Sequence, residues 1–241
     1  MLSKLGACSR SQAERAVREG RVTVDGRVVL DPERPTEAGR QRIALDGVVV
    51  GASARIYIAL NKPRGIVTSA SDEHGRATVY DLLKDAGLPW LGPVGRLDRA
   101  SEGLLLLSND SVWAAGLTEP RHHVDKTYHV QVDCVPDEAL LRQLEAGVVE
   151  QGECLAAKRA SLLRHGEKHA WLAIVLDEGR NRHIRRLLAA HGVGVLRLIR
   201  VSVGPLSLGD LPKGQWRHLD AAEVQALASV RACSRSPGGL S

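Results

Sequence analysis

The spacing of apolar and polar residues divides the chain into a short first part and a longer second part. In the first part, Ser11 and Glu14 have the spacing of a capping box at the start of a helix. Asp25 and Gly26 stand between alternating apolar residues, which is a strong signal for a β-hairpin. The pattern therefore predicts a small module over residues 1–50. Its helices are expected over 2–8 and 11–19, its hairpin over 21–30 and a further strand over 43–50, with a linker at 51–54.

The longer part, over residues 53–232, has the pattern of an α+β domain. The leucine run from Leu104 to Leu107 is too short for a membrane span and too apolar for a surface loop, so it predicts a buried strand. From residue 126 onward the predicted order is strand, helix, strand, strand, helix, strand, which is typical of a ferredoxin-like fold with a mixed or antiparallel sheet. The tail, 233–241, is predicted to be disordered. Strands are expected at 56–60, 104–107, 126–133, 156–163, 170–177 and 195–203, and helices at 111–117, 137–146, 181–191 and 220–230.

Composition and charge narrow the class of protein. The four cysteines stand far apart and no CxxC pair occurs among them, which argues against a zinc ribbon or a redox pair and suits a reducing cytosol. Lys and Arg outnumber Asp and Glu by 33 to 28, and a net charge of +5 fits a polyanionic partner. No targeting segment or long apolar stretch is evident. We therefore expect a cytoplasmic protein that has no metal and does not contact a membrane.

The most informative charged residues precede the leucine run. Arg96 and Asp98 lie between a glycine turn and the predicted buried strand, with Gly103 interrupting the chain just before it. An aspartate beside a buried strand is costly unless it is paired or used, so Asp98 is a candidate for chemistry. An ordinary turn aspartate is the competing interpretation.

The order of these residues decides between the two interpretations. Residues 95–98, Gly-Arg-Leu-Asp, followed by Ser101, Gly103 and the leucines, resemble the catalytic signature of pseudouridine synthases. The form is that of the family named for ribosomal small-subunit pseudouridine synthase A. The resemblance implies that Asp98 is the essential catalytic residue, and that Arg96 holds a phosphate or fills the space left by the flipped base.

Further motifs occur in the order that this family has. Lys126-Thr127-Tyr128 resembles its Lys-x-Tyr motif, whose tyrosine would present a face to the target base, although a strand tyrosine is often part of a core. Lys126 is expected to contact RNA. Asn61 and Lys62 are expected in a turn after a strand, where they would support the cleft. Leu198 is a candidate for an apolar wall beside the base.

The basic segment 177–188 resembles the third motif of the family. Arg185 would match the arginine that pairs with the catalytic aspartate, and His183 stands where the family usually has glutamine. On the predicted helix, Arg182, Arg185 and Arg186 share one face. If the resemblance holds, Arg182 and Arg186 contact RNA. The alternative is an amphipathic helix whose basic face is only solvated.

Residues 2–50 resemble the αL-type RNA-binding module of ribosomal small-subunit protein four. Arginines that contact phosphate through such a module would give affinity and salt dependence rather than sequence choice. Solvated surface charge is the alternative for any single one of them. The arginines in question are Arg10, Arg15, Arg18, Arg21 and Arg27.

The combined resemblance implies an enzyme with an αL-type module and a pseudouridine synthase domain. Such an enzyme would isomerise a specific uridine of ribosomal RNA without a cofactor, acting as a monomer on a uridine-containing stem-loop, free or within a ribosomal assembly intermediate. Three alternatives were weighed: a non-catalytic ribosome-binding protein, a glycosidase that uses Asp98 with Glu102, and a deaminase. The first would have no use for Asp98, Tyr128 and Arg185 together. The second needs two facing carboxylates, whereas Glu102 is expected in a polar turn, and the third needs a zinc signature that is missing.

Overall fold

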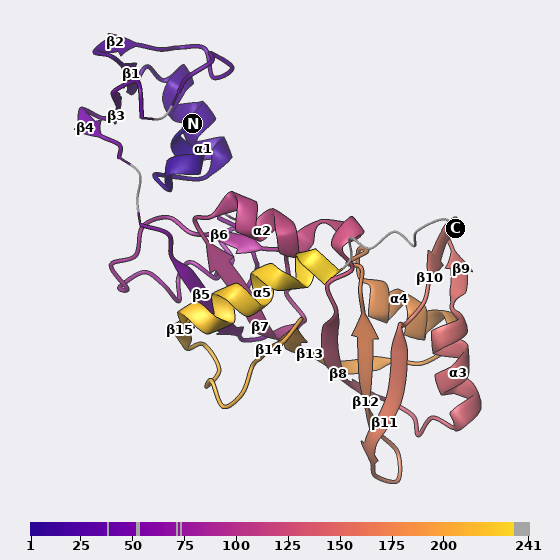
Figure 1. The fold of residues 1–241 in the computed structure, drawn as a ribbon. Helices are drawn as coiled ribbons and strands as arrows, with labels where there is room; N and C mark the ends of the chain where they lie inside the picture. Colours follow the sequence, from indigo (N-terminus) through magenta and orange to yellow (C-terminus); the bar gives the residue numbers. More distant parts are fainter. Residues whose placement is uncertain (38, 52–53, 71, 73, 234–241) are drawn as a thin grey trace.

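The computed structural model describes residues 1–37, 39–51, 54–70, 72 and 74–233, and it consists of a small N-terminal module and a larger α+β part (Figure 1). The expected linker falls partly, and the expected tail almost wholly, on residues outside this description. Cys233 is the exception, because it is the last residue of helix α5 (Ala221–Cys233).

The N-terminal module packs a helix against a four-stranded sheet. The predicted hairpin is confirmed: Asp25 and Gly26 take left-handed φ angles of 52° and 78° between its two strands. The capping box is formed by Ser9 and Gln12 rather than by Ser11 and Glu14, because the helix begins at residue 10. The elements are η1 (Leu2–Leu5), α1 (Arg10–Arg18), β1 (Val22–Val24), β2 (Arg27–Val28), β3 (Ile43–Leu45) and β4 (Val48–Val49).

The segment 43–50 contains two strands where one was expected. A second turn, Asp46-Gly47, separates β3 from β4, and both of its residues have positive φ. The sheet order is β2-β1-β3-β4. The apolar residues of α1 and of the inner strands form a separate small core that includes Leu2, Ala16, Val22 and Ile43.

The larger part is built on a nine-stranded sheet in the order β11-β12-β8-β13-β7-β5-β15, with β14 paired to β13 and β6 paired to β7. Two halves of this sheet meet where β13 lies beside β7. The strands are β5 (Tyr57–Lys62), β6 (Gly92–Val94), β7 (Glu102–Ser108), β8 (Lys126–Val132), β11 (Arg159–His165), β12 (Ala170–Leu176), β13 (Val195–Val203), β14 (Leu206–Ser207) and β15 (Trp216–His218).

The half that starts at β8 confirms the predicted ferredoxin-like order. Strand β8 is followed by α3 (Glu138–Ala146), β11, β12, α4 (His183–Ala190) and β13, and all pairings within this half are antiparallel. A small hairpin of β9 (Val148–Glu150) and β10 (Glu153–Leu155) is inserted after α3 and was not predicted. Alternate residues of β8 and β12 are buried against α3 and α4, so these strands have the period of two that one covered face produces.

The other half places the leucine run inside the molecule, as predicted. All seven residues of β7 are buried, and the leucines alternate between two cores. Leu105 and Leu107 pack with β5 and the segment that follows it, while Leu104 and Leu106 pack with α2 (Ser111–Thr118) and α5. A strand covered on both faces reads as a continuous apolar run rather than an alternating one. A 3-10 turn, η2 (Pro120–His122), follows α2.

The two halves are joined through Gly103. Strands β13 and β7 run parallel at this junction and are in register at Ile199 with Glu102 and at Arg200 with Gly103. Gly103 lies within the strand rather than before it, with a φ of 101°, and a Cβ atom there would come 2.2 Å from the carbonyl oxygen of Arg200. Only glycine satisfies both the backbone angle and this close approach.

We therefore expect Gly103→Ala to destabilise the protein by about 3 kcal/mol or more, because the methyl group must displace a strand backbone and also occupy a strained conformation. Urea unfolding followed by circular dichroism measures the effect. Gly166→Ala is the matched control, since the nearest atom to its added Cβ is 3.9 Å away; it should change the stability by less than about 0.5 kcal/mol. Equal midpoints for the two variants would contradict this account of the junction.

Candidate active site

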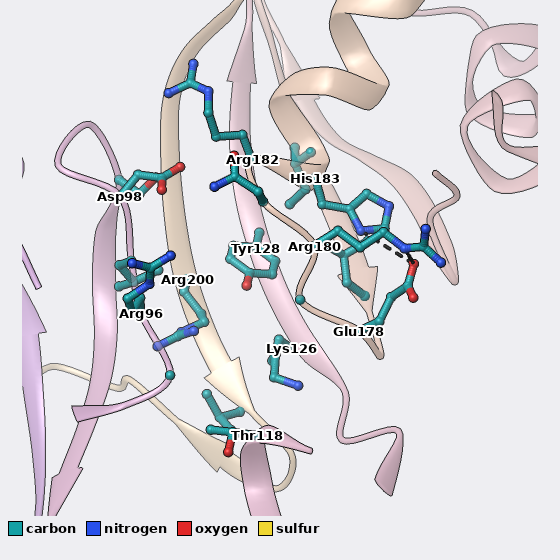
Figure 2. A pocket seen from close by; sticks show the side chains of 18 of the residues that line it. Arg96, Asp98, Thr118, Lys126, Tyr128, Glu178, Arg180, Arg182, His183 and Arg200 are labelled. Atoms are coloured by element: carbon teal, nitrogen blue, oxygen red, sulfur yellow. Dashed lines mark hydrogen bonds and ion pairs between the residues drawn. The ribbon is translucent and has the colours of Figure 1, made fainter. Parts of the chain in front are cut away.

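A cavity of about 580 Å³ lies at the junction of the two halves. It is lined by the loop after β6, the end of α2, the first residues of β8, the segment between β12 and α4, and the middle of β13 (Figure 2). Segments that are distant in sequence thus contribute to one hollow. Of the residues proposed from the sequence, the cavity contains Arg96, Asp98, Lys126, Tyr128, Arg182, Arg185 and Leu198.

Asp98 lies on the connection between β6 and β7, with an exposed side chain that lines the cavity. The backbone around it is fixed on both sides. Leu97 is buried, and its carbonyl oxygen accepts a hydrogen bond of 2.9 Å from the Thr68 hydroxyl. The amide of Ser101 donates to the Asp98 carbonyl oxygen at 2.9 Å. The chain therefore holds the backbone of Asp98 and leaves its carboxylate facing the cavity.

Lys62 is the most deeply buried charged group near this loop, with a residue exposure of 0%. Its Nζ donates hydrogen bonds to the carbonyl oxygens of Pro63 at 3.1 Å, Asp98 at 3.2 Å and Ser101 at 2.9 Å. Burial lowers the pKa of Lys62 to about 8, even though the nearby carboxylates of Asp98 and Glu102 act in the opposite direction. Lys62 therefore ties the ends of the Asp98 loop to strand β5.

The expectation that Asn61 and Lys62 form a turn is wrong, because they are the last two residues of β5. Asn61 is also buried, and its side-chain amide donates to the Leu211 carbonyl oxygen at 2.7 Å. The polar character of these residues favours a turn after the strand. Inside the fold, however, carbonyl oxygens that are distant in sequence accept hydrogen bonds from both side chains.

Tyr128 and Leu198 form part of the cavity wall on the ferredoxin-like side. Tyr128 is 9% exposed and belongs to the main core, yet its ring lies at the centre of the cavity view in Figure 2. Leu198 is 7% exposed on the neighbouring strand β13 and is in register with Val130. Tyr128 therefore belongs to the core and also lines the cavity.

Arg185 lines the cavity but makes no ion pair with Asp98 in the part of the chain that the structure describes. Its guanidinium donates to the carbonyl oxygens of Ala100 and Val195, each at 3.3 Å. Burial lowers the pKa of Arg185, as do the positive charges of Arg182 and Arg64, while the negative charge of Asp98 raises it. Arg185 thus holds the loop that carries Asp98 and interacts with its carboxylate across the cavity.

Helix α4 begins at His183, two residues later than expected, and Arg182 precedes it with a left-handed φ of 49°. Arg182 is therefore not on the same helix face as Arg185 and Arg186. Arg182 lines the cavity, whereas Arg186 pairs with Glu150 and Glu153 of the β9–β10 hairpin. His183, at the position where the family usually has glutamine, is buried and lines the cavity, and burial lowers its pKa.

Two buried charges at the junction were missed in the sequence. Arg200, inside the apolar strand β13, is 4% exposed and lines the cavity. Glu102, expected in a polar turn, is the first residue of β7 and forms ion pairs with Arg197 at 3.0 Å and Lys213 at 2.7 Å. The two cations hold the pKa of Glu102 below its usual value against the effect of burial. Glu102 is thus a structural ion rather than a second cavity carboxylate.

In the N-terminal module, three of the proposed RNA-contacting arginines are engaged on the surface. Arg15 pairs with Glu19, Arg18 pairs with Glu14, and Arg21 forms a two-pronged pair with Asp46 at 2.8 and 2.6 Å. Arg10 is exposed. Such exposed pairs are weak and are readily exchanged for phosphate.

Comparison with known proteins settles the family. The model of the RNA pseudouridylate synthase family matches residues 56–190, and that of the S4 domain matches residues 1–41. The chain belongs to the RNA pseudouridylate synthases. It is therefore an isomerase, and it carries an RNA-binding S4 domain ahead of the synthase domain.

Individual relatives cover nearly the whole chain. It is 36% identical to a ribosomal large subunit pseudouridine synthase B of Bacillus subtilis, over 95% of this chain and 94% of the relative. It is 39% identical to an uncharacterized RNA pseudouridine synthase of Mycobacterium tuberculosis, over 94% of this chain and 91% of that protein. A crystal structure of a pseudouridylate synthase matches with a TM-score of 0.65 and 30% identity, covering 94% of this chain and 96% of that one.

Among the residues that the structure describes, no group of three or more His, Cys, Asp or Glu side chains lies in an arrangement that could hold a metal ion. None of the helices described is both long and apolar enough to span a membrane.

The Lys62 contacts give a testable expectation. Lys62→Met should lower turnover at least tenfold and lower the melting temperature, because the carbonyl oxygens of Pro63, Asp98 and Ser101 lose a buried donor, which costs about 1–3 kcal/mol per unsatisfied group. Thermal unfolding and pseudouridine formation on ribosomal RNA are the measurements. Lys84→Met, at an exposed lysine in the segment between β5 and β6, is the control. Wild-type stability and turnover in Lys62→Met would show that the Asp98 loop does not depend on this amine.

Proposed function

We propose that this synthase isomerises a specific uridine of ribosomal RNA to pseudouridine, with Asp98 as the catalytic residue in a base-flipping cleft. The observation that supports it best is the convergence of Asp98, Tyr128 and Arg185 on one cavity, although they come from three separate segments. A carboxylate, an aromatic ring and a guanidinium are the groups that this chemistry needs.

The reaction breaks the bond between the sugar and N1 of the uracil, turns the base, and joins the sugar to C5. C5 then loses its proton to water, and N1 gains a proton. Atoms and electrons balance within the nucleotide, so we propose that no cofactor takes part. Asp98 acts at the sugar as a nucleophile or as the base that removes the C2′ proton, and either role requires an ionised carboxylate. Arg185 lines the same cavity, and its positive charge interacts with the Asp98 carboxylate across it.

The cavity is the site that we propose for the flipped nucleotide. Its volume of about 580 Å³ lies within the usual range for small-molecule sites. Extruding a base costs a few kcal/mol. Stacking on Tyr128 against the apolar side chain of Leu198 would return about 1–3 kcal/mol of this cost. Arg96 and Arg182, at the cavity rim, would contact the RNA backbone or fill the space left by the base.

The names of the relatives and the S4 domain support ribosomal RNA as the substrate. A relative that covers nearly the whole chain is named for the large ribosomal subunit, and we propose large-subunit ribosomal RNA as the substrate. The target would be a uridine in a stem-loop, free or within an assembly intermediate, and the enzyme would act in the cytoplasm as a monomer. We propose residues 1–50 as the RNA-binding module, 53–232 as the catalytic domain and 233–241 as a tail.

The catalytic assignment is tested with Asp98→Asn, which preserves shape and removes the ionisable carboxylate. Tritium release from ribosomal RNA labelled at C5 of uridine should fall by about a thousandfold or more, while RNA binding is retained. Asp85→Asn, at an exposed loop position, should keep full activity. Activity of Asp98→Asn within tenfold of the wild type would remove Asp98 from the mechanism.

The module assignment predicts the behaviour of a fragment that begins at residue 53. Without the basic module, binding to ribosomal RNA should weaken and its dependence on salt should become shallower, because fewer phosphates are neutralised. The catalytic domain has its own cores and should still unfold cooperatively. Titrations at several salt concentrations measure both effects, and an unchanged affinity and salt slope would refute the binding role.

A further inference from the structure

Arg200 has an unusual environment for a buried cation. Its side chain is held on one side, where Nε donates to the Leu104 carbonyl oxygen at 2.7 Å. Its Nη2 atom is fully buried and has no hydrogen-bond partner in the described part of the chain. No ion pair to Arg200 is formed there either, and the residue lines the cavity.

A guanidinium in this state is costly. It carries five N–H donors, and a buried charge without a counter-ion costs several kcal/mol. A protein keeps such a group when a ligand supplies the missing partner, and groups of this kind cluster at functional sites. The unsatisfied donor therefore indicates a negatively charged or oxygen-rich ligand in the cavity.

Lys126 adds a second positive charge to the same cavity. Its Nζ donates to the Val124 carbonyl oxygen at 2.7 Å. Burial and, to a smaller extent, the charge of Arg200 lower the pKa of Lys126 to about 8, while the carboxylates of Asp177 and Asp125 act in the opposite direction. Both carboxylates already have other partners, because Asp177 contacts His123 at 3.0 Å and Asp125 pairs with Lys158 at 2.7 Å. The two cavity cations thus repel each other without a carboxylate bridging them.

We propose that Arg200 and Lys126 form an anion subsite that binds the phosphate group carried by the flipped nucleotide. The proposal rests on the proposed function, and it adds a subsite to the cavity. Figure 2 shows Lys126 on the other side of Tyr128 from Asp98, with Arg200 beside this row of residues. A base stacked on Tyr128 would therefore have the carboxylate near one end of the nucleotide and the cations near the other.

A phosphate fits this subsite better than a uracil carbonyl group. A carbonyl oxygen accepts hydrogen bonds but brings no net charge, so the repulsion between Arg200 and Lys126 would persist. A phosphate oxygen can accept a hydrogen bond from the guanidinium of Arg200 in the cavity wall and also neutralises the cations, and such charge-assisted bonds are the stronger kind.

The guanidinium is also held in place before the ligand arrives. The Arg200 backbone is in register with Gly103 of β7 on one side and with Tyr128 of β8 on the other. Its Nε donates a hydrogen bond to the carbonyl oxygen of Leu104, also in β7. A preorganised donor loses little side-chain entropy on binding. The rung that joins the two halves of the sheet thus also sets the position of the subsite relative to the Asp98 loop.

The test compares the affinities of uridine 5′-monophosphate and uridine for the full-length enzyme, measured by ligand-observed NMR titration. The wild type should bind the monophosphate about tenfold or more tightly than the nucleoside, since a charge-assisted contact contributes at least that factor. Arg200→Met and Lys126→Met should each reduce this ratio severalfold, and Arg200→Lys should restore part of it. Lys168→Met, at an exposed lysine in the loop between β11 and β12, is the control and should keep the wild-type ratio.

The pH dependence provides a second readout that a structural role would not produce. Because the pKa of Lys126 is about 8, raising the pH through that value removes its charge, and the preference for the monophosphate should decline. In Lys126→Met this decline should be absent. Thermal unfolding of each variant verifies that it is folded, and Lys126→Met tests the subsite independently of any folding defect in Arg200→Met.

A ratio near one in the wild type, or an unchanged ratio in folded Arg200→Met and Lys126→Met, would overturn the subsite. These outcomes are distinguishable from failure of the proposed function, because binding is measured without turnover. If Asp98→Asn remains active while the ratio is tenfold, the catalytic assignment fails and the anion subsite stands. If Asp98→Asn is inactive while the ratio is near one, only the subsite fails.

Discussion

The close approach of Gly103 to the backbone of Arg200 is the constraint on which the site depends. It allows the two halves of the sheet to be joined by parallel pairing of β13 with β7 at two positions. The same junction contains Glu102, whose carboxylate is held by Arg197 of β13 and by Lys213 from the segment before β15. A buried carboxylate with two cationic partners is strongly penalised if either half shifts, so the ion pairs fix the alignment that the glycine permits.

The chain fixes the Asp98 loop through its carbonyl groups rather than through the carboxylate. Lys62 binds the carbonyl oxygens of Asp98 and Ser101, and Arg185 binds that of Ala100. Two cations from segments that are distant in sequence therefore hold three carbonyl groups of one loop. In the described structure the Asp98 side chain has no hydrogen-bond partner, and it lines the cavity from a backbone that these contacts hold in place.

The sequence predicted features whose causes are local. The leucine strand, the Asp25-Gly26 hairpin and the ferredoxin-like order depend on apolar runs, turn residues and periodicity, all of which neighbouring residues determine. Asp46-Gly47 carries the same hairpin signal and could have been predicted by the same rule. The resemblance correctly indicated the enzyme family and the S4 domain, while the roles of individual residues in the cavity remain proposals.

Features that depend on distant partners were not predictable in this way. Lys62 and Glu102 were interpreted as turn residues because they are charged, yet each is buried with partners 36 to 111 residues away. The sequence predicts a strand that contains Arg200, but none of the adjacent residues in the sequence indicates that Arg200 lines a cavity. The start of α4 was placed two residues early because Arg182 adopts a left-handed conformation that its residue type does not favour. In each case the tertiary environment overrides a local preference.

The pairing of early strands with late ones also determines when a growing chain can complete the cavity. Strands β5 and β7 pair with each other early, but the second neighbour of β5 is β15 and the second neighbour of β7 is β13, which are synthesised much later. Contacts of such long sequence separation are slow to form. Until residues 195–203 have left the ribosome, the Asp98 loop has Lys62 but not the strand that joins β7 to the ferredoxin-like half. The order of synthesis therefore separates assembly of the wall of the cavity from assembly of the loop that carries the carboxylate.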